Sequence, residues 1–200
     1  MRQYFEKNKK YWIGVSVTLL SISLGGIMFF SSGNSIDASD SLYKQELAKE
    51  GESVVEINET VALTEDLSVV GNKTLTGDGN LDLNGTITVT SGSTLTVDDV
   101  VTVNTNAEKP GIIIETGASV VLDGTMLTNC TYGIKNYGTV EVKNVAITDC
   151  ADHSVYNVGT LTGTNLTITT SADLCVANGG AFDVDGLTVS GSFSKGIYNN

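Results

Sequence analysis

The side chains best suited to catalysis or metal binding are few in this chain of 200 residues. It contains one histidine and three cysteines. His153 follows Asp152 in a segment that we expect to be a turn, and a lone histidine in a turn is more often a surface residue than a catalytic one. Cys130, Cys150 and Cys175 do not have the spacing of zinc ligands. The sequence also has no serine–histidine or cysteine–histidine arrangement with the spacing of a nucleophilic site.

The charged residues limit the kinds of molecule that this chain is expected to bind. The formal net charge is −12 at pH 7, and Arg2 is the only arginine among 11 basic residues. Without further guanidinium groups the chain cannot make the bidentate contacts that nucleic-acid recognition favours, so a nucleic-acid partner is excluded. The acidic balance is typical of a solvated surface, and it leaves calcium binding open as an alternative. No other cofactor is expected.

The N-terminal segment has the pattern of an export signal. Four basic residues lie within residues 1–10, and residues 11–30 form an uncharged, largely apolar run. This order is typical of a signal peptide, although the run is long enough to remain as a membrane anchor. We therefore assign residues 1–40 to a signal peptide or an N-terminal membrane anchor, and we expect a hydrophobic export helix in it, with membrane contact only through residues 11–30. In both cases we expect the rest of the chain to be extracellular or at the cell surface.

A repeat of 21 residues organises the second half of the chain. Glycines recur at positions 117, 138, 159 and 180. An asparagine stands two residues before each of the last three glycines, and one further step reaches a fourth: Asn136, Asn157, Asn178 and Asn199. A fixed period near 20 with alternating apolar residues predicts a solenoid of stacked coils. Because parallel coils lie about 4.8 Å apart, we expect these asparagines to form a structural ladder of hydrogen-bonded amides.

The elements that position these residues are expected to be strands and turns, with one short helix. Residues 41–51 have a helical pattern in which Tyr43 and Leu47 lie on one face. Residues 52–200 alternate short apolar runs with Gly, Asn and Asp, which predicts a parallel all-β solenoid. The period predicts a further glycine directly after Asn200, so we expect the solenoid to continue beyond that residue.

Three features carry a resemblance to a known fold. They are the segment GESVVEINETVAL after the helix, the segment GNKTLTGDGNLDLNG at residues 71–85, and coils of the type GIxNxG. Over about residues 42–200 the chain resembles the right-handed parallel β-helix (pectate-lyase-like) superfamily, and more closely the β-helix regions of bacterial cell-surface proteins. The resemblance implies a right-handed coil and a capping helix at 41–51 that closes the open end of the stack.

The resemblance also raises the question of enzymatic activity. Lyases of this superfamily use calcium, held by aspartates, and an arginine or lysine as the base that removes a proton from the sugar. In this chain the base would have to be Lys135 or Lys143. Lys143 falls in an outward column with Asp123, Thr164 and Asp185, in which threonine dilutes the carboxylates that calcium requires. The pattern therefore favours a solvated acidic face over a lyase site.

One outward column suggests a surface for sugars. Tyr156 and Tyr198 share it with Lys135 and Ala177, and the two tyrosines are two coils apart, roughly 10 Å. This spacing suits stacking on successive sugars, and the alternative is two exposed tyrosines with no ligand. Tyr156, Tyr198 and Lys135 are therefore the candidate glycan-facing residues.

Two cysteines are expected to meet inside the stack. Cys130 and Cys150 occupy equivalent positions on neighbouring coils, at a separation that a disulfide tolerates. Stacked side chains point in parallel, which is poor disulfide geometry, so two small buried thiols are the alternative.

These patterns favour a non-catalytic extracellular β-helix module of a bacterial surface protein, a stalk or an adhesin. Its expected partner is a polysaccharide or a host or cell-surface glycan. The alternative is a secreted polysaccharide lyase or glycoside hydrolase of the pectate-lyase-like fold, with its active site mostly outside these residues.

Overall fold

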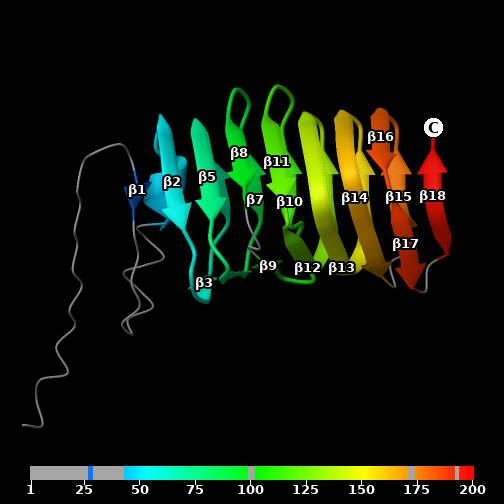
Figure 1. Cartoon of the computed structure of the whole chain (residues 1–200), viewed down its shortest axis with the longest axis horizontal. Coiled ribbons are helices and arrows are strands. Elements are labelled where there is room, and N and C mark those ends of the chain that lie inside the picture. Colours follow the sequence, from blue (N-terminus) through cyan, green and yellow to red (C-terminus); the bar gives the residue numbers. More distant parts are fainter. Residues whose placement is uncertain (1–26, 29–42, 99–101, 171–173, 192–193) are drawn as a thin grey trace, which may run out of the picture.

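The computed structural model describes residues 27–28, 43–98, 102–170, 174–191 and 194–200. Over these residues the chain forms a parallel β-solenoid of about 7 turns, each of about 21 residues. Figure 1 shows the coils side by side along the long axis of the molecule, from β2 (Glu52–Glu56) to β18 (Lys195–Asn199) at the C-terminus. The expected parallel solenoid is thus confirmed.

Each coil contributes to three ladders of parallel strands. The first ladder contains β2, β5 (Asn72–Thr76), β8 (Thr94–Val97), β11 (Ser119–Asp123), the first parts of β13 (Thr139–Asn157) and β14 (Thr160–Thr170), and β16 (Ala181–Asp185). The second contains β3 (Val61–Leu63), β6 (Asn80–Leu83), β9 (Thr102–Asn104), the start of β12 (Met126–Asn136), later parts of β13 and β14, and β17 (Thr188–Gly191). The third contains β4 (Leu67–Val69), β7 (Ile87–Val89), β10 (Ile112–Ile114), the ends of β12 and β13, β15 (Leu174–Asn178) and β18.

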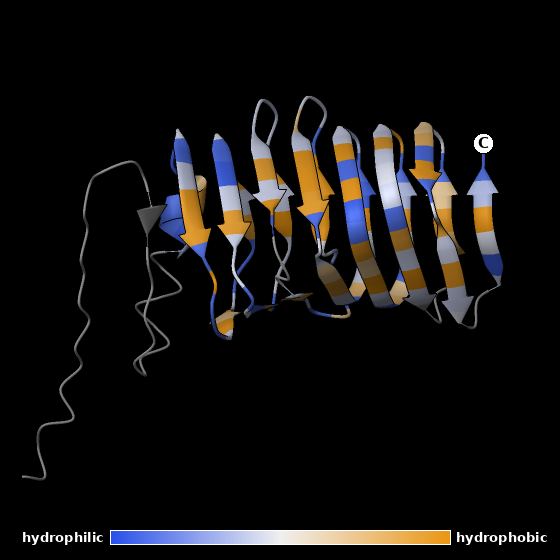
Figure 2. Ribbon diagram, in the orientation of Figure 1, coloured by the Kyte–Doolittle hydropathy of each residue, from blue (hydrophilic) through white to orange (hydrophobic). Residues whose placement is uncertain are grey.

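Alternation of side chains builds one continuous core inside the three ladders. In a strand, successive side chains point to opposite faces, so every second residue faces the core. Figure 2 shows this as alternating hydrophobic and hydrophilic bands along the strands. The apolar columns that the repeat predicts are in register: Val120, Val140, Leu161 and Phe182 pair in succession, as do Leu127, Ile147, Ile168 and Val189. Stacking of like side chains therefore fills the core coil by coil.

The corner between the first and second ladders requires left-handed backbone. The residues at this corner in four successive coils all have positive φ: Gly124 (66°), Asn144 (52°), Asn165 (55°) and Gly186 (77°). Glycine and asparagine adopt this conformation at the lowest cost, which explains why the four positions hold only these two residue types. Asn165 also donates from Nδ2 to Oδ1 of Asn144 at 2.9 Å.

In β12 and β13, the chain passes from the second ladder to the third without leaving the strand conformation. Asp152 and His153 lie within β13, and Cys175 lies within β15, where it is fully buried. The prediction that His153 occupies a turn is therefore wrong. A register shift between Cys130 and Tyr132 lets the strand bend without a separate turn.

Two short elements lie next to the first coils of the solenoid. Residues 43–48 are helical, and Tyr43 and Leu47 are both buried in the core, 3% and 2% exposed. Strand β1 (Ile27–Met28) pairs with β2. These two residues belong to the expected export segment and are in a strand instead of a helix, because the edge of β2 offers backbone groups to pair with. The rest of residues 1–40 lies outside the described residues, and among the described ones no helix is long and apolar enough to cross a membrane.

Candidate functional site

Aromatic side chains gather on the outer surface where the second ladder meets the third. Tyr132 and Lys135 come from β12, Tyr137 follows directly, and His153 and Tyr156 come from β13. We call these five residues the aromatic patch. Tyr132 and His153 are register partners, as are Lys135 and Tyr156, because the strands that carry them are neighbours in the stack. The period of the solenoid therefore brings the patch together.

The rings of the patch pack against one another. Tyr132 and His153 stack with centroids 5.2 Å apart and 15° between their planes. Tyr156 meets both rings edge-on, at 6.3 Å and 6.1 Å with 83° between the planes. Tyr137 contacts Tyr156 at 6.1 Å and 62°. These contacts fix the orientations of the rings relative to one another.

Charged groups frame the patch. The Nζ atom of Lys135 lies 5.0 Å from the ring centroid of Tyr132 and 6.0 Å from that of Tyr137, within cation–π range. The Asp152 carboxylate, which accepts a hydrogen bond from Tyr132, raises the pKa of that phenol to about 12. Oδ1 of Asp152 is 2.6 Å from Nδ1 of His153, without the alignment of a hydrogen bond. Tyr132 is therefore a neutral hydrogen-bond donor at physiological pH.

The predicted outward column runs through the patch and beyond it. Lys135 pairs with Tyr156, Tyr156 with Ala177, and Ala177 with Tyr198. Tyr198 is 49% exposed, and Nζ of Lys195 lies 5.8 Å from its ring centroid. Sequence reasoning placed Tyr156 and Tyr198 in one column but missed Tyr132, Tyr137 and His153 as its neighbours. Tyr132 and His153 are 21 residues apart, which is the period of the coils and indicates that they are neighbours. The expectation that His153 lies in a turn prevented this inference.

The asparagine ladder lies inside the solenoid. Nδ2 of Asn136 donates to Oδ1 of Asn157 at 2.7 Å, Asn157 donates likewise to Asn178 at 2.7 Å, and Asn178 to Asn199 at 2.6 Å. The same amides also bond backbone groups near the turns. Asn136 accepts from the backbone N–H of Gly138 in the turn that follows it, and Asn157 donates to the carbonyl of Ala181 on the next coil. The ladder is therefore a structural device that satisfies buried turn groups.

The two stacked cysteines are buried and are not joined by a disulfide. Cys130 and Cys150 are register partners, with their Sγ atoms 3.2 Å apart. The hydrogen bond with Cys130, together with burial, raises the pKa of Cys150 well above its ordinary range. The same hydrogen bond lowers the pKa of Cys130. Both thiols are buried, whereas nucleophilic chemistry requires an accessible thiolate.

The candidate lyase base Lys143 is held as an ammonium. Its Nζ forms an ion pair with Asp123, its register partner on the preceding coil. This hydrogen bond and the negative charge raise the pKa of Lys143, whereas a general base needs a lowered pKa. Among the described residues, no group of three or more His, Cys, Asp or Glu side chains is placed to hold a metal ion.

Lys73 is a charged residue at a core position that sequence reasoning missed. It stands between Ser53 and Leu95 in an inward column and is 2% exposed. Its Nζ donates to the carbonyl of Gly51 at 3.2 Å. Burial lowers its pKa, although Glu46 and Glu50 oppose the shift. The ammonium therefore fixes the segment that follows residues 43–48 against the first coils.

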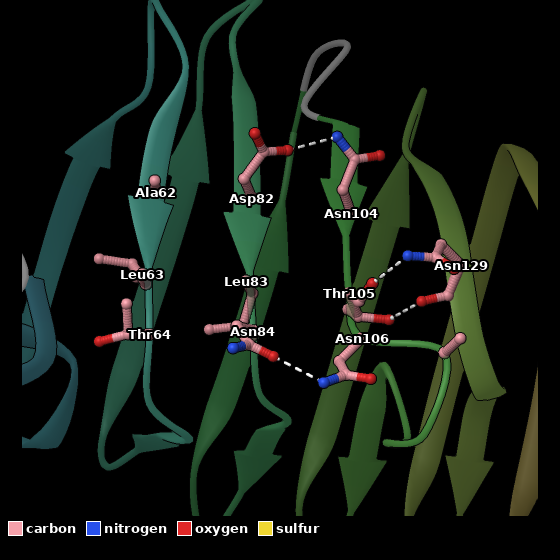
Figure 3. A pocket seen from close by; sticks show the side chains of 11 residues that line it. Ala62, Leu63, Thr64, Asp82, Leu83, Asn84, Asn104, Thr105, Asn106 and Asn129 are labelled. Atoms are coloured by element: carbon pink, nitrogen blue, oxygen red, sulfur yellow. Dashed lines mark hydrogen bonds between the residues drawn. The ribbon is translucent and has the colours of Figure 1, made fainter.

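An open depression of about 580 Å³ lies on the second ladder, toward the N-terminal end. Figure 3 shows that its amides bond along the stack. Asn104 donates to Asp82 at 2.6 Å, and Asn106 donates to Asn84 at 2.7 Å. Asn129 donates to the carbonyl of Thr105 at 2.7 Å. The amide groups of Asn104, Asn106 and Asn129 thus donate hydrogen bonds between neighbouring coils, and these bonds hold the coils together.

Comparison with known proteins adds no assignment to this geometry. No protein-family model, no curated protein and no solved structure matches the chain.

Proposed function

We propose that this chain is a non-catalytic extracellular β-helix module of a bacterial surface protein, a stalk or adhesin that binds glycan through the aromatic patch. The observation that carries the proposal is the packing of Tyr132, His153 and Tyr156 into one fixed surface beside the Lys135 ammonium. Export rests on the pattern of residues 1–40.

The chemistry of the patch suits a sugar. The C–H groups on one face of a pyranose are weakly positive and apolar, and they pack against the negative face of an aromatic ring. Lys135 offers hydrogen-bond donors to the hydroxyl groups at the edge of the sugar. Because the rings are already oriented by one another, little conformational entropy is lost on binding.

The solenoid suits the role of a display scaffold. Each coil contacts its neighbours in the stack, so outward-facing positions recur along the axis with the period of the coils. A ligand that is itself a repeating polymer can then meet equivalent positions on successive coils. The resemblance to β-helix regions of bacterial surface proteins agrees with this role.

A secreted polysaccharide lyase or glycoside hydrolase remains the alternative proposal. It rests on the resemblance to the pectate-lyase-like superfamily. The raised pKa of Lys143 and its pairing with Asp123 argue against this residue as the base. Calcium-dependent release of unsaturated oligosaccharides from a polyuronate by the purified chain would overturn the non-catalytic proposal.

The binding proposal is tested on a glycan array that holds both α- and β-linked chains. We expect the full chain to bind a subset of glycans, and the Tyr132→Ala/Tyr156→Ala variant to lose that signal. Met126→Ala is the matched control, because Met126 is also an exposed large side chain, 37% accessible, but lies outside the patch. Equal binding by the double variant and the control, or no binding to any glycan, contradicts the proposal.

A further inference from the structure

We infer that the glycan is a linear β-1,4-linked chain of pyranoses that lies along the solenoid axis, with alternate sugars stacked on Tyr156 and Tyr198. This inference rests on the proposed function and specifies the class of its ligand. It depends on the spacing of the two tyrosines, on the orientation of the Tyr156 ring, and on the small residue between them.

The spacing of the tyrosines matches alternate sugars of such a chain. Tyr156, Ala177 and Tyr198 are successive register partners on β13, β15 and β18. Tyr156 and Tyr198 are therefore separated by two interstrand spacings, roughly 10 Å. In an extended β-1,4-linked chain, the length of one pyranose is close to one interstrand spacing. Neighbouring sugars in such a chain are rotated by about half a turn relative to each other. Every second sugar thus presents the same face at the spacing of the two tyrosines.

The ring of Tyr156 is oriented for a ligand that runs along the axis. Tyr132 and His153 lie on neighbouring coils and stack face to face, 5.2 Å apart, so their planes lie across the solenoid axis. The ring of Tyr156 stands at 83° to both. Its plane therefore runs along the axis, which is the direction of a chain that spans β13, β15 and β18.

The residue between the tyrosines is small and does not project toward the sugar chain. Ala177 is the partner of both Tyr156 and Tyr198, and it is buried, 8% exposed, so its methyl group does not displace the middle sugar. A large side chain at this position would lift the middle sugar and separate its neighbours from the rings. Nζ of Lys195 lies over the ring of Tyr198, 5.8 Å from its centroid, and supplies donors for hydroxyl groups at that end.

The linkage follows from the straight alignment of the two platforms. An α-1,4-linked chain of the same sugars curves, so its first and third sugars do not present one face along a straight line. Cello-oligosaccharides and malto-oligosaccharides contain the same sugar and differ in this linkage, which makes them matched probes.

The test is a calorimetric titration of the full chain with cello- and chito-oligosaccharides of increasing length, and with maltotriose. A trisaccharide is the shortest chain that reaches both tyrosines, so we expect it to bind roughly tenfold more tightly than the disaccharide in at least one β-1,4 series. A fourth sugar should add little, and maltotriose should bind no better than the β-linked disaccharide. Tyr198→Ala should abolish the gain from the third sugar and leave disaccharide affinity unchanged, whereas Tyr198→Phe should preserve the gain.

The outcomes separate the two proposals. Glycan binding on the array without a gain from the third sugar, with an equal gain for maltotriose, or with a gain that survives in Tyr198→Ala, overturns the inference and leaves the proposed function standing. No binding to any glycan, in the array or in the titration, overturns both. Thermal unfolding of each variant shows whether it is folded, and Tyr198→Phe supplies a folded comparison in which only the hydroxyl is lost.

Discussion

The side-chain amide of Asn157 forms hydrogen bonds with three other residues. It is fully buried, accepts from Asn136, and donates to Asn178 and to the carbonyl of Ala181. Its neighbours Asn136 and Asn178 are buried as well, so removal of this amide leaves buried polar groups without partners. The repetition of asparagine every 21 residues is thus a consequence of the turn that each amide satisfies.

We therefore predict that Asn157→Ala lowers the free energy of unfolding by about 3 kcal/mol, the cost of leaving buried donors and acceptors unpaired. Asn199→Ala is the matched control, because Asn199 accepts from Asn178 at the exposed end of the same ladder. It should cost less than about 1 kcal/mol. Urea denaturation of both variants measures the difference, and equal losses would show that the ladder does not stabilise the interior.

Lys73 is predicted to make stability depend on pH. Burial lowers its pKa below the ordinary value of 10.5. Between the folded and the unfolded pKa the unfolded chain binds more protons, so the stability of the native protein rises with pH through this window. Below the folded pKa the lysine is charged in both states, and the cost of burying that charge is constant.

Lys73→Met should therefore raise the free energy of unfolding at pH 7 by about 1–2 kcal/mol, because methionine fills the core position without a charge. Its advantage over the native protein should shrink as the pH approaches 10.5. Chemical denaturation between pH 7 and 10.5 checks this, with Lys195→Met as the exposed control. A pH-independent difference would mean that Lys73 does not titrate differently in the fold.

At the scale of elements, the sequence predicts the coils best where their length is constant. Register partners from Val140 onward are 21 residues apart, as in Val140, Leu161 and Phe182. The glycine and asparagine columns of that region can be counted without a structure. Between β2 and β11 the separations vary, since Ser53, Lys73, Leu95 and Val120 are partners in succession. Because the loop lengths change in this region, the inward position of Lys73 could not be predicted from the repeat. The bulge near Cys130 likewise prevented prediction of the aromatic patch.

Gly163 interrupts an inward column of apolar residues, and the structure explains why glycine is found there. It follows Val142 and precedes Val184 in the first ladder, with φ at +146°. A Cβ atom there would lie 1.8 Å from the carbonyl oxygen of Val142, so the coils approach too closely for any side chain. Glycine is needed at this position for contact between neighbouring backbones.

Gly163→Ala is predicted to lower the free energy of unfolding by about 3 kcal/mol, through backbone strain and separation of β13 from β14. Gly179→Ala is the control, because the nearest atom to its Cβ would be the carbonyl oxygen of Asn157 at 4.0 Å. It should change stability by less than about 0.5 kcal/mol. If thermal melts show the two variants to be equally stable, the close approach at Gly163 is not a constraint.

At the scale of the whole molecule, strand pairing is almost entirely between neighbouring coils. The stability of such a stack is a sum of coil terms and interface terms, so damage to one interface is expected to stay local. The strain introduced by Gly163→Ala falls on the interface between β13 and β14. The coils that contain β5 and β8 meet each other through a separate interface and retain it.

Hydrogen exchange resolved by peptide tests this locality. In Gly163→Ala, backbone amides of β14 and β16 should lose protection by a factor of roughly 100, which corresponds to about 3 kcal/mol, whereas those of β5 and β8 should keep the protection of the native protein. A uniform loss over all coils would instead mean that the solenoid opens as one cooperative unit. Locality also bears on the proposed glycan surface, because Tyr156 and Tyr198 lie on opposite sides of the coil that carries β15. Loosening of the coils near β14 should then weaken trisaccharide binding before the molecule as a whole unfolds.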